Sequence, residues 1–232
     1  MVNLIKSILL RFKLLFLSKK EILHIHNIIN SNVDLNDLVQ WSKSNFRVPT
    51  PQFIKNSVFQ RHTDDSTVWV ETGTYKGTST KFFSKYSKFV HTIEPDYNLW
   101  LSTKNELNNK GYKNITFYNG TSEETLDKVL NVIEGEKLSI WLDGHWSGGD
   151  TFLGENPTPV LEELKIIEKY LKKFKKISIL IDDIRDFKNY ELESNNNYPE
   201  KMILIDYALK NNLYWEIIYD ILIFTNIPNS KL

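Results

Sequence analysis

Short apolar runs alternate with amphipathic segments through the middle of the 232-residue chain. The runs at 67–71, 89–93, 115–119, 138–142 and 177–181 predict strands, and the segments near 78–86, 97–110, 122–133 and 158–173 predict helices. Strands and helices that alternate at this spacing form a parallel sheet with right-handed crossovers and helices on both faces. We therefore predict an α/β fold with a Rossmann-like sheet.

Different patterns flank this alternating part. After it, a helix is expected at 200–212, and "YWEIIYDILIFTN" divides into two short β-rich halves at 214–219 and 221–225, which predict a C-terminal antiparallel hairpin. Before it, a helical pattern is interrupted by "RVPTP", whose prolines enforce an extended bend. The predicted organisation is a helical N-terminal extension over 1–62 and one main domain over 63–232.

Residues 1–20 combine apolar side chains with Lys6, Arg11 and Lys13. These charges interrupt the apolar run, so neither a transmembrane helix nor a signal peptide is predicted. A basic amphipathic helix remains, which either packs on the main domain or a second subunit, or binds anionic lipid. We expect a cytoplasmic protein, with membrane association at the inner surface and homo-oligomer formation as open alternatives.

Charge and cysteine content narrow the range of partners. Lys+Arg and Asp+Glu both total 29, so no net positive field favours nucleic acid, and a nucleic-acid partner is not expected. The chain has no cysteine, which is compatible with a reducing compartment. Any metal would therefore be held by carboxylates or histidines.

Every predicted parallel strand ends in polar, acidic or glycine residues. Because ligands bind beyond the carboxyl ends of strands in an open α/β sheet, these residues are the first candidates for a site. In chain order they are Glu71, Gly73 and Gly77; Glu94; Gly120, Thr121 and Ser122; Asp143 and His145; and Asp182 and Asp183.

The first predicted strand leads into the turn "ETGTYKG", residues 71–77. It lacks the G-x-G-x-x-G spacing that seats a pyrophosphate on a helix N-terminus. The acid Glu71 would repel a diphosphate and suits a ligand that carries a cationic amine or sulfonium. The alternative is that Gly73 and Gly77 only shape a tight turn between strand and helix.

Glu94 follows the second predicted strand, 23 residues after Glu71. A carboxylate at this position can accept both hydrogen bonds from a ribose diol. This role fits an adenosyl ligand and NAD equally well, and Glu94 could also be a solvated loop acid before Pro95.

The segments "VETGTYKGTST", "HTIEPD" and "YNGTSEE" resemble the cofactor half of class I S-adenosylmethionine-dependent methyltransferases, and the resemblance covers roughly residues 67–225. It implies a methyltransferase fold in which Glu71 and Gly73 lie by the methionine part of the cofactor. It further implies that Glu94 holds the ribose hydroxyls and that Thr121 and Ser122 flank the adenine. The remaining residues predicted to bind the cofactor are Thr74, Gly77, Thr78, Ser79 and Asp143.

Three acids follow the fourth and fifth predicted strands, in "IWLDGHWSGGD" and "ILIDDIRDF". Asp143, Asp182 and Asp183 would repel one another unless a hard cation such as Mg²⁺ lay among them. Alternatively, they cap helices or pair with Arg185. The pattern resembles metal-dependent sugar O-methyltransferases of the macrocin type, whose corresponding acids bind Mg²⁺, and methyltransferase-like proteins associated with surface polysaccharide synthesis.

Methyl transfer to an aliphatic hydroxyl requires alignment and removal of a proton. Mg²⁺ can lower the pKa of a bound hydroxyl, and His145 or Asp143 is the predicted general base. The prediction is thus a metal-assisted, S-adenosylmethionine-dependent O-methyltransferase that acts on a hydroxyl of a sugar or glycan precursor. The rivals are an NAD-dependent oxidoreductase and a non-catalytic membrane-surface scaffold with a vestigial nucleoside pocket.

Overall fold

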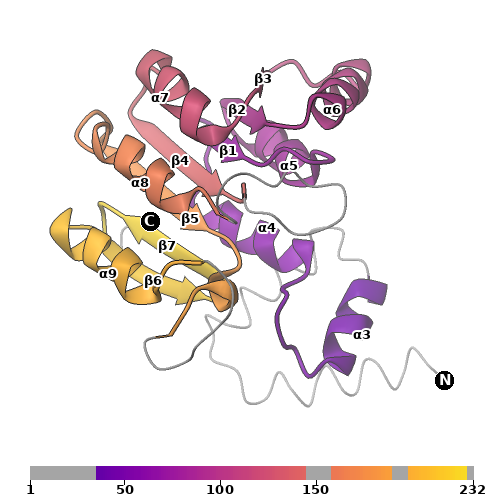
Figure 1. Cartoon of the computed structure of the whole chain (residues 1–232). Helices are drawn as coiled ribbons and strands as arrows, with labels where there is room; N and C mark the ends of the chain where they lie inside the picture. Colours follow the sequence, from indigo (N-terminus) through magenta and orange to yellow (C-terminus); the bar gives the residue numbers. More distant parts are fainter. Residues whose placement is uncertain (1–34, 145–157, 190–197, 229–232) are drawn as a thin grey trace. The chain divides into compact units, whose positions relative to one another are not determined.

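The computed structural model describes residues 35–144, 158–189 and 198–228 (Figure 1). The chain divides into two compact units, Met1–Val58 and Phe59–Leu232. The described part of the first unit contains α3 (Leu35–Lys43) and the start of α4 (Gln52–Arg61), with Trp41 packed edge-on against Phe53. The amphipathic segment predicted at residues 1–20 lies outside the described residues.

The second unit is built on a seven-stranded sheet in the order β3-β2-β1-β4-β5-β7-β6 (Figure 1). The pairs among β1 to β5 are parallel, whereas β7 is antiparallel to both of its neighbours, β5 and β6. The predicted mostly parallel sheet with a C-terminal hairpin is therefore confirmed. The strands are β1 (Val68–Thr72), β2 (Phe89–Glu94), β3 (Ile115–Asn119), β4 (Lys137–Leu142), β5 (Lys176–Ile181), β6 (Tyr214–Ile218) and β7 (Ile221–Thr225).

Helices cover both faces of this sheet, as the alternating pattern predicts. The helices α7, α8 and α9 pack on one face, and α5 packs on the other with the end of α4 (Figure 1). One boundary differs, because the helix expected over 158–173 ends at Glu168 and continues as tight turns. The helices are α5 (Thr78–Tyr86), α6 (Tyr97–Asn109), α7 (Ser122–Val132), α8 (Val160–Glu168), α9 (Lys201–Lys210) and the 3₁₀ turn η1 (Ile184–Asp186).

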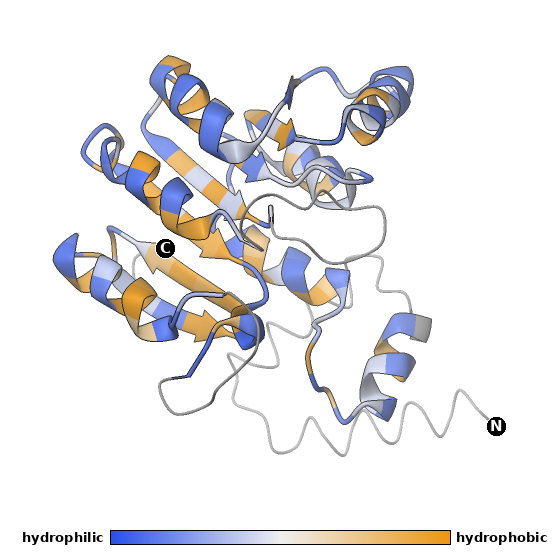
Figure 2. Cartoon of the chain, viewed as in Figure 1, coloured by the Kyte–Doolittle hydropathy of each residue, from blue (hydrophilic) through white to orange (hydrophobic). Residues whose placement is uncertain are grey.

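The central strands consist mainly of hydrophobic residues (Figure 2). The core forms because their side chains are buried on both faces of the sheet. Val70, Ile140 and Ile179 are fully buried on the face covered by α7 to α9. On the opposite face, Trp69 and Trp141 pack around Phe59, the first residue of the second unit. Each such side chain stabilises the fold by about 1.5–3 kcal/mol through removal of apolar surface from water.

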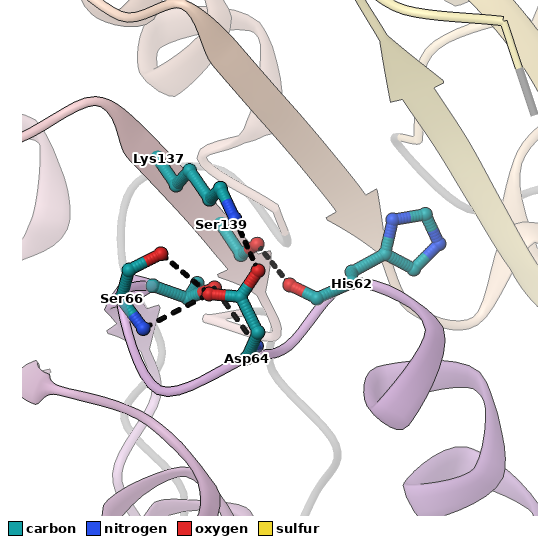
Figure 3. A network of polar contacts seen from close by, with 6 residues as sticks. His62, Asp64, Ser66, Lys137 and Ser139 are labelled. Carbon is teal, nitrogen blue, oxygen red and sulfur yellow. Dashed lines mark hydrogen bonds and ion pairs between the residues drawn. The ribbon is translucent and has the colours of Figure 1, made fainter. Parts of the chain in front are cut away.

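A polar network joins the loop before β1 to the start of β4 (Figure 3). Asp64 accepts hydrogen bonds from the backbone N–H and hydroxyl of Ser66 and pairs with Lys137 at the start of β4. Burial opposes ionisation of Asp64, but the hydrogen bonds from Lys137 and Ser66 outweigh it and hold its pKa below the usual range. The Ser139 hydroxyl donates to the His62 carbonyl at 2.7 Å, so β4 is also joined to the chain that enters β1.

Candidate functional site

The strand order reverses between β1 and β4, and the turns after these strands therefore diverge to opposite sides of the sheet. Gly73, after β1, has φ +86°, which favours glycine. A Cβ at this position would lie 2.9 Å from the backbone carbonyl carbon of Asp143, after β4. The Gly73 N–H donates to the Ile93 carbonyl at 2.9 Å, so the turn is held between the ends of β2 and β4.

Gly77 is the N-cap residue of α5 and has φ +69°. A Cβ here would lie 2.9 Å from Thr103 Cγ2 and 3.1 Å from Leu107 Cδ1, both on α6. The glycine thus permits close packing of α5 against α6. The positive φ and the close packing together account for Gly77, as in the alternative that the glycines only shape the turn. The exposed residue Thr78 begins the helix beside it.

Glu71 is fully buried at the end of β1. Its carboxylate accepts hydrogen bonds from the hydroxyls of Ser79, Thr80 (2.6 Å) and Thr92 (2.7 Å). Burial raises its pKa to about 7, although the three hydroxyl donors oppose that rise. The Glu71 carboxylate, which is predicted to lie by the methionine part of the cofactor, thus forms hydrogen bonds with side chains of the protein itself. Ser79 is one of these hydrogen-bond donors.

Glu94 lies at the end of β2, beside the glycine turn, and is 4% exposed. Its carboxylate accepts the backbone N–H of Tyr75 at 2.7 Å and that of Asp96 at 3.0 Å. Burial raises its pKa, with these two hydrogen bonds acting in the opposite direction. Each carboxylate oxygen has a second lone pair, so these bonds leave acceptor capacity for ribose hydroxyls.

The end of β3 is tied to Glu94 through the backbone. Asn119 Nδ2 and Gly120 N–H both donate to the Glu94 carbonyl, at 2.9 and 3.2 Å. Thr121 is the N-cap residue of α7, and Ser122, the first residue of that helix, is 6% exposed. The residues predicted to flank adenine therefore follow directly from a strand tip that is hydrogen-bonded to the backbone carbonyl of Glu94.

The acids after β4 and β5 occupy adjacent strand ends. Asp143 N–H donates to the Thr72 carbonyl and Asp182 N–H donates to the Leu142 carbonyl, both at 3.1 Å. Asp183 has φ +52°, and its carboxylate accepts a hydrogen bond from Arg185 at 2.5 Å. This ion pair is the alternative that sequence reasoning left open for the acids.

A magnesium site at these acids has no support among residues 35–144, 158–189 and 198–228. Within those ranges, no group of three or more His, Asp or Glu side chains is placed to hold a metal ion. Arg185 also pairs with Asp220, in the turn between β6 and β7, so a guanidinium supplies positive charge at the Asp183 carboxylate. His145, the other candidate general base, lies outside the described residues.

Glu163 is a buried acid that sequence reasoning missed. It lies on α8, is 1% exposed, and lines with Asp182 and Tyr198 a cavity of about 10 Å³, the size of one water molecule. Its signal was in the sequence, because in "VLEELKIIE" it falls on the apolar stripe formed by Val160, Leu164 and Ile167. Glu163 therefore adds a buried acid to those at the ends of β4 and β5, where the methyl acceptor is expected to bind.

Comparisons with known proteins support the fold. No protein family model and no curated protein matches the chain. A protein assigned as an rRNA methylase from Clostridium thermocellum is 11% identical with a TM-score of 0.52, over 77% of this chain and 97% of its own. An rRNA methylase from Streptococcus thermophilus is 19% identical, with a TM-score of 0.45 over 77% of this chain and 96% of its own. A protein assigned as a methyltransferase from Streptococcus mutans, in complex with SAH, is 12% identical, with a TM-score of 0.46 over 77% of this chain and 97% of its own. The chain thus has a Rossmann-like methyltransferase fold.

Proposed function

We propose that the protein transfers a methyl group from S-adenosylmethionine. The observation that carries this proposal is the position of Glu94, whose carboxylate accepts the Tyr75 N–H of the glycine turn at 2.7 Å. The acid predicted to bind the ribose thus lies against the glycine turn, next to the point where the strand order reverses. The methyltransferase fold of the solved Clostridium thermocellum structure supports the same reading.

An NAD-dependent oxidoreductase is the rival enzyme. The pyrophosphate of NAD would need a glycine-rich helix N-terminus. The segment "TYKG" that leads into α5 has a single glycine, Gly77, and this glycine packs against α6. Isothermal titration calorimetry of the full chain with S-adenosylhomocysteine (SAH) and NADH separates the two. We expect SAH to bind and NADH not to bind, and the reverse result would overturn the proposal.

The role of Glu94 can be tested in the same titration. Glu94→Gln keeps the shape of the side chain but leaves one carbonyl oxygen where the carboxylate offers two oxygens, and we expect it to weaken SAH binding by about tenfold. Glu124→Gln, an exposed acid on α7, is the matched control and should leave the affinity unchanged. Equal affinities of the two variants would remove Glu94 from the cofactor site.

We further propose a hydroxyl of a sugar or glycan precursor as the methyl acceptor, on the resemblance to sugar O-methyltransferases. Transfer of tritiated methyl from S-adenosylmethionine to nucleotide sugars and their oligosaccharide products tests this, with total RNA as a counter-substrate. A methyl ether resists mild alkali, whereas a methyl ester is hydrolysed, so the stability of the label identifies the acceptor group. If the RNA is labelled and the sugars are not, the proposed sugar acceptor is wrong and RNA takes its place.

Magnesium assistance and membrane association stay predictions from the sequence. The described acids do not form a metal-binding group, and we derive no step of the transfer through a metal. Among the helices that the structure describes, none has the length and apolar character to cross a bilayer. Flotation of the full chain with anionic vesicles, compared with a chain lacking residues 1–20, tests the predicted peripheral contact.

A further inference from the structure

The Glu71 carboxylate is enclosed by hydroxyl groups from two elements. Glu71 on β1 is paired in register with Thr92 on β2, whose hydroxyl donates to Glu71 Oε2 at 2.7 Å. Ser79 and Thr80, in the first turn of α5, supply the other two donors. The carboxylate therefore joins β1, β2 and the start of α5 around the glycine turn.

The network continues to the turn itself through Thr74. Thr92 Oγ1 lies 2.6 Å from Thr74 Oγ1 as well as 2.7 Å from Glu71 Oε2. A hydroxyl has one hydrogen, so when Thr92 donates to ionised Glu71, Thr74 must donate to Thr92. The charge on Glu71 thus fixes the direction of both bonds, from Thr74 to Thr92 to Glu71.

Protonation of Glu71 removes the charge that fixes the direction of these hydrogen bonds. A carboxylic acid carries an O–H that needs an acceptor, so at least one of the three hydroxyls would have to turn its own hydrogen away from Glu71. Thr80 and Thr92, like Thr74, are at most 2% exposed, so solvent cannot receive a hydrogen bond displaced from their hydroxyls, whereas Ser79 is partly exposed. Loss of the charge therefore weakens the hydrogen bonds that join the turn and the start of α5 to Glu71.

We propose that ionised Glu71 is a positioning residue for the adenosyl cofactor: it holds Thr74 and the start of α5 in the binding conformation from inside the fold, without contact with the ligand. This inference rests on the proposed function. It differs from a direct role, in which the negative charge of Glu71 would attract the sulfonium of S-adenosylmethionine.

The inference makes cofactor affinity depend on pH. Because burial raises the pKa of Glu71 to about 7, the ionised fraction falls as the pH drops through neutrality, and affinity should fall with it. Two other acids lie near Glu71. The negative charge of Glu94 contributes to the raised pKa of Glu71, and the pKa of Glu94 is itself raised. Asp143 directly follows the neighbouring strand β4. Glu71→Gln retains both of these acids, so the pH dependence it loses belongs to Glu71.

Two ligands and three threonine variants make the test specific. S-adenosylmethionine carries a sulfonium, whereas SAH is a neutral thioether with the same amino-acid and nucleoside parts. A positioning role lowers the affinity for both ligands as the pH falls, while attraction to the sulfonium affects S-adenosylmethionine alone. Thr92→Val removes the hydroxyl and Thr92→Ser retains it, and Thr116→Val on β3 is a matched strand control outside the network.

The experiment is calorimetric titration of the full chain with both ligands at mildly acidic and mildly alkaline pH. We expect the wild type to bind both ligands more weakly in acid, Glu71→Gln to bind weakly throughout with a smaller pH dependence, and Thr92→Val to lose about tenfold in alkali. Thr92→Ser and Thr116→Val should resemble the wild type. Circular dichroism of each variant establishes that it is folded.

Three results would count against the inference. A pH dependence confined to S-adenosylmethionine would assign Glu71 a direct electrostatic role instead. Wild-type affinity in Thr92→Val would show that the hydroxyl network does not position the site, with the proposed function intact. Absence of binding by the wild type with either ligand would overturn both the inference and the proposed function.

Discussion

Trp69 and Phe83 stack face to face, with ring centroids 4.0 Å apart and ring planes 10° from parallel. Trp69 belongs to β1 and Phe83 to α5, so the stack fixes the helix on the sheet. Glu71 lies two residues beyond Trp69 on the same face of β1. The stack therefore supports the helix whose first turn supplies Ser79 and Thr80 to that carboxylate.

Phe83→Ala should destabilise the protein by about 3–5 kcal/mol, because it leaves a cavity beside Trp69 and removes buried apolar surface. Urea unfolding measures the change. Lys85→Ala, at an exposed position of the same helix, is the control and should change the free energy of unfolding by less than about 0.5 kcal/mol. A similar small effect of Phe83→Ala would show that the stack does not hold α5.

Gly73→Ala should abolish detectable SAH binding. Gly73 and Gly111 have nearly the same backbone angle, φ +86° and φ +85°. A Cβ at residue 73 would collide with the Asp143 carbonyl, whereas one at residue 111 would meet no atom of the described residues within 4 Å. Gly111→Ala therefore carries the backbone strain alone, about 1 kcal/mol, without the collision. If both variants bind SAH equally well, the contact between the β1 and β4 turns is unimportant for the site.

Arg185→Gln should destabilise the fold by about 2–4 kcal/mol, because it withdraws a cation from the buried carboxylates of Asp183 and Asp220. Burial raises the pKa of Asp220, and Arg185 opposes that rise. Adding Asp220→Asn to Arg185→Gln should recover part of the loss, because one buried charge is then removed. Thermal unfolding of the two variants checks this order, and a double variant less stable than Arg185→Gln would contradict it.

The stability of the protein should depend on the ionisation of Glu71. Its pKa rises from 4.5 to about 7 on folding, so its contribution to stability is fully present below pH 4.5 and is lost as the pH rises to about 7, a change of up to about 3 kcal/mol. Burial lowers the pKa of His62 to about 3 and that of His91 to about 4, which gives these residues the opposite sign. The difference between wild type and Glu71→Gln in urea unfolding, measured across this range, isolates Glu71. A constant difference would refute the raised pKa.

Chelation should leave the affinity for SAH unchanged, because the groups at the glycine turn and at Glu94 are held by protein hydrogen bonds. Calorimetry with and without EDTA measures this. A loss of methyl transfer on chelation, with binding retained and magnesium restoring the activity, would support the metal that the acids in the sequence predict. A loss of SAH binding itself would contradict the expectation.

The order of elements could be predicted closely because β1, β4, β5 and β7 are nearly continuous buried runs. The first strand, expected at 67–71, is Val68–Thr72, and the helix expected at 78–86 is Thr78–Tyr86. Glu94 could likewise be placed at a strand tip, because its position depends on its distance along the chain from the first turn. These features follow from local pattern and spacing.

The surroundings of the acids could not be predicted in the same way. Thr80 and Thr92 meet Glu71 only because α5 and β2 pack against β1, and nothing in their local sequence names the partner. The ion pair of Arg185 with Asp183 could be considered from the sequence, because the two residues are close in the chain. The ion pair of Arg185 with Asp220 could not, because Asp220 is 35 residues away. Side-chain partners of this kind depend on the completed sheet.

The position of β7 has a consequence for the order of folding. In chain order, β5 is made before β6 and β7, yet it is β7 that pairs with β5 and separates it from β6. Until β7 is available, the apolar strand "KISILI" presents an unpaired edge that other chains can extend. A nascent or truncated chain that ends before Ile221 is therefore expected to aggregate through β5, and late docking of the hairpin protects the sheet as well as completing it.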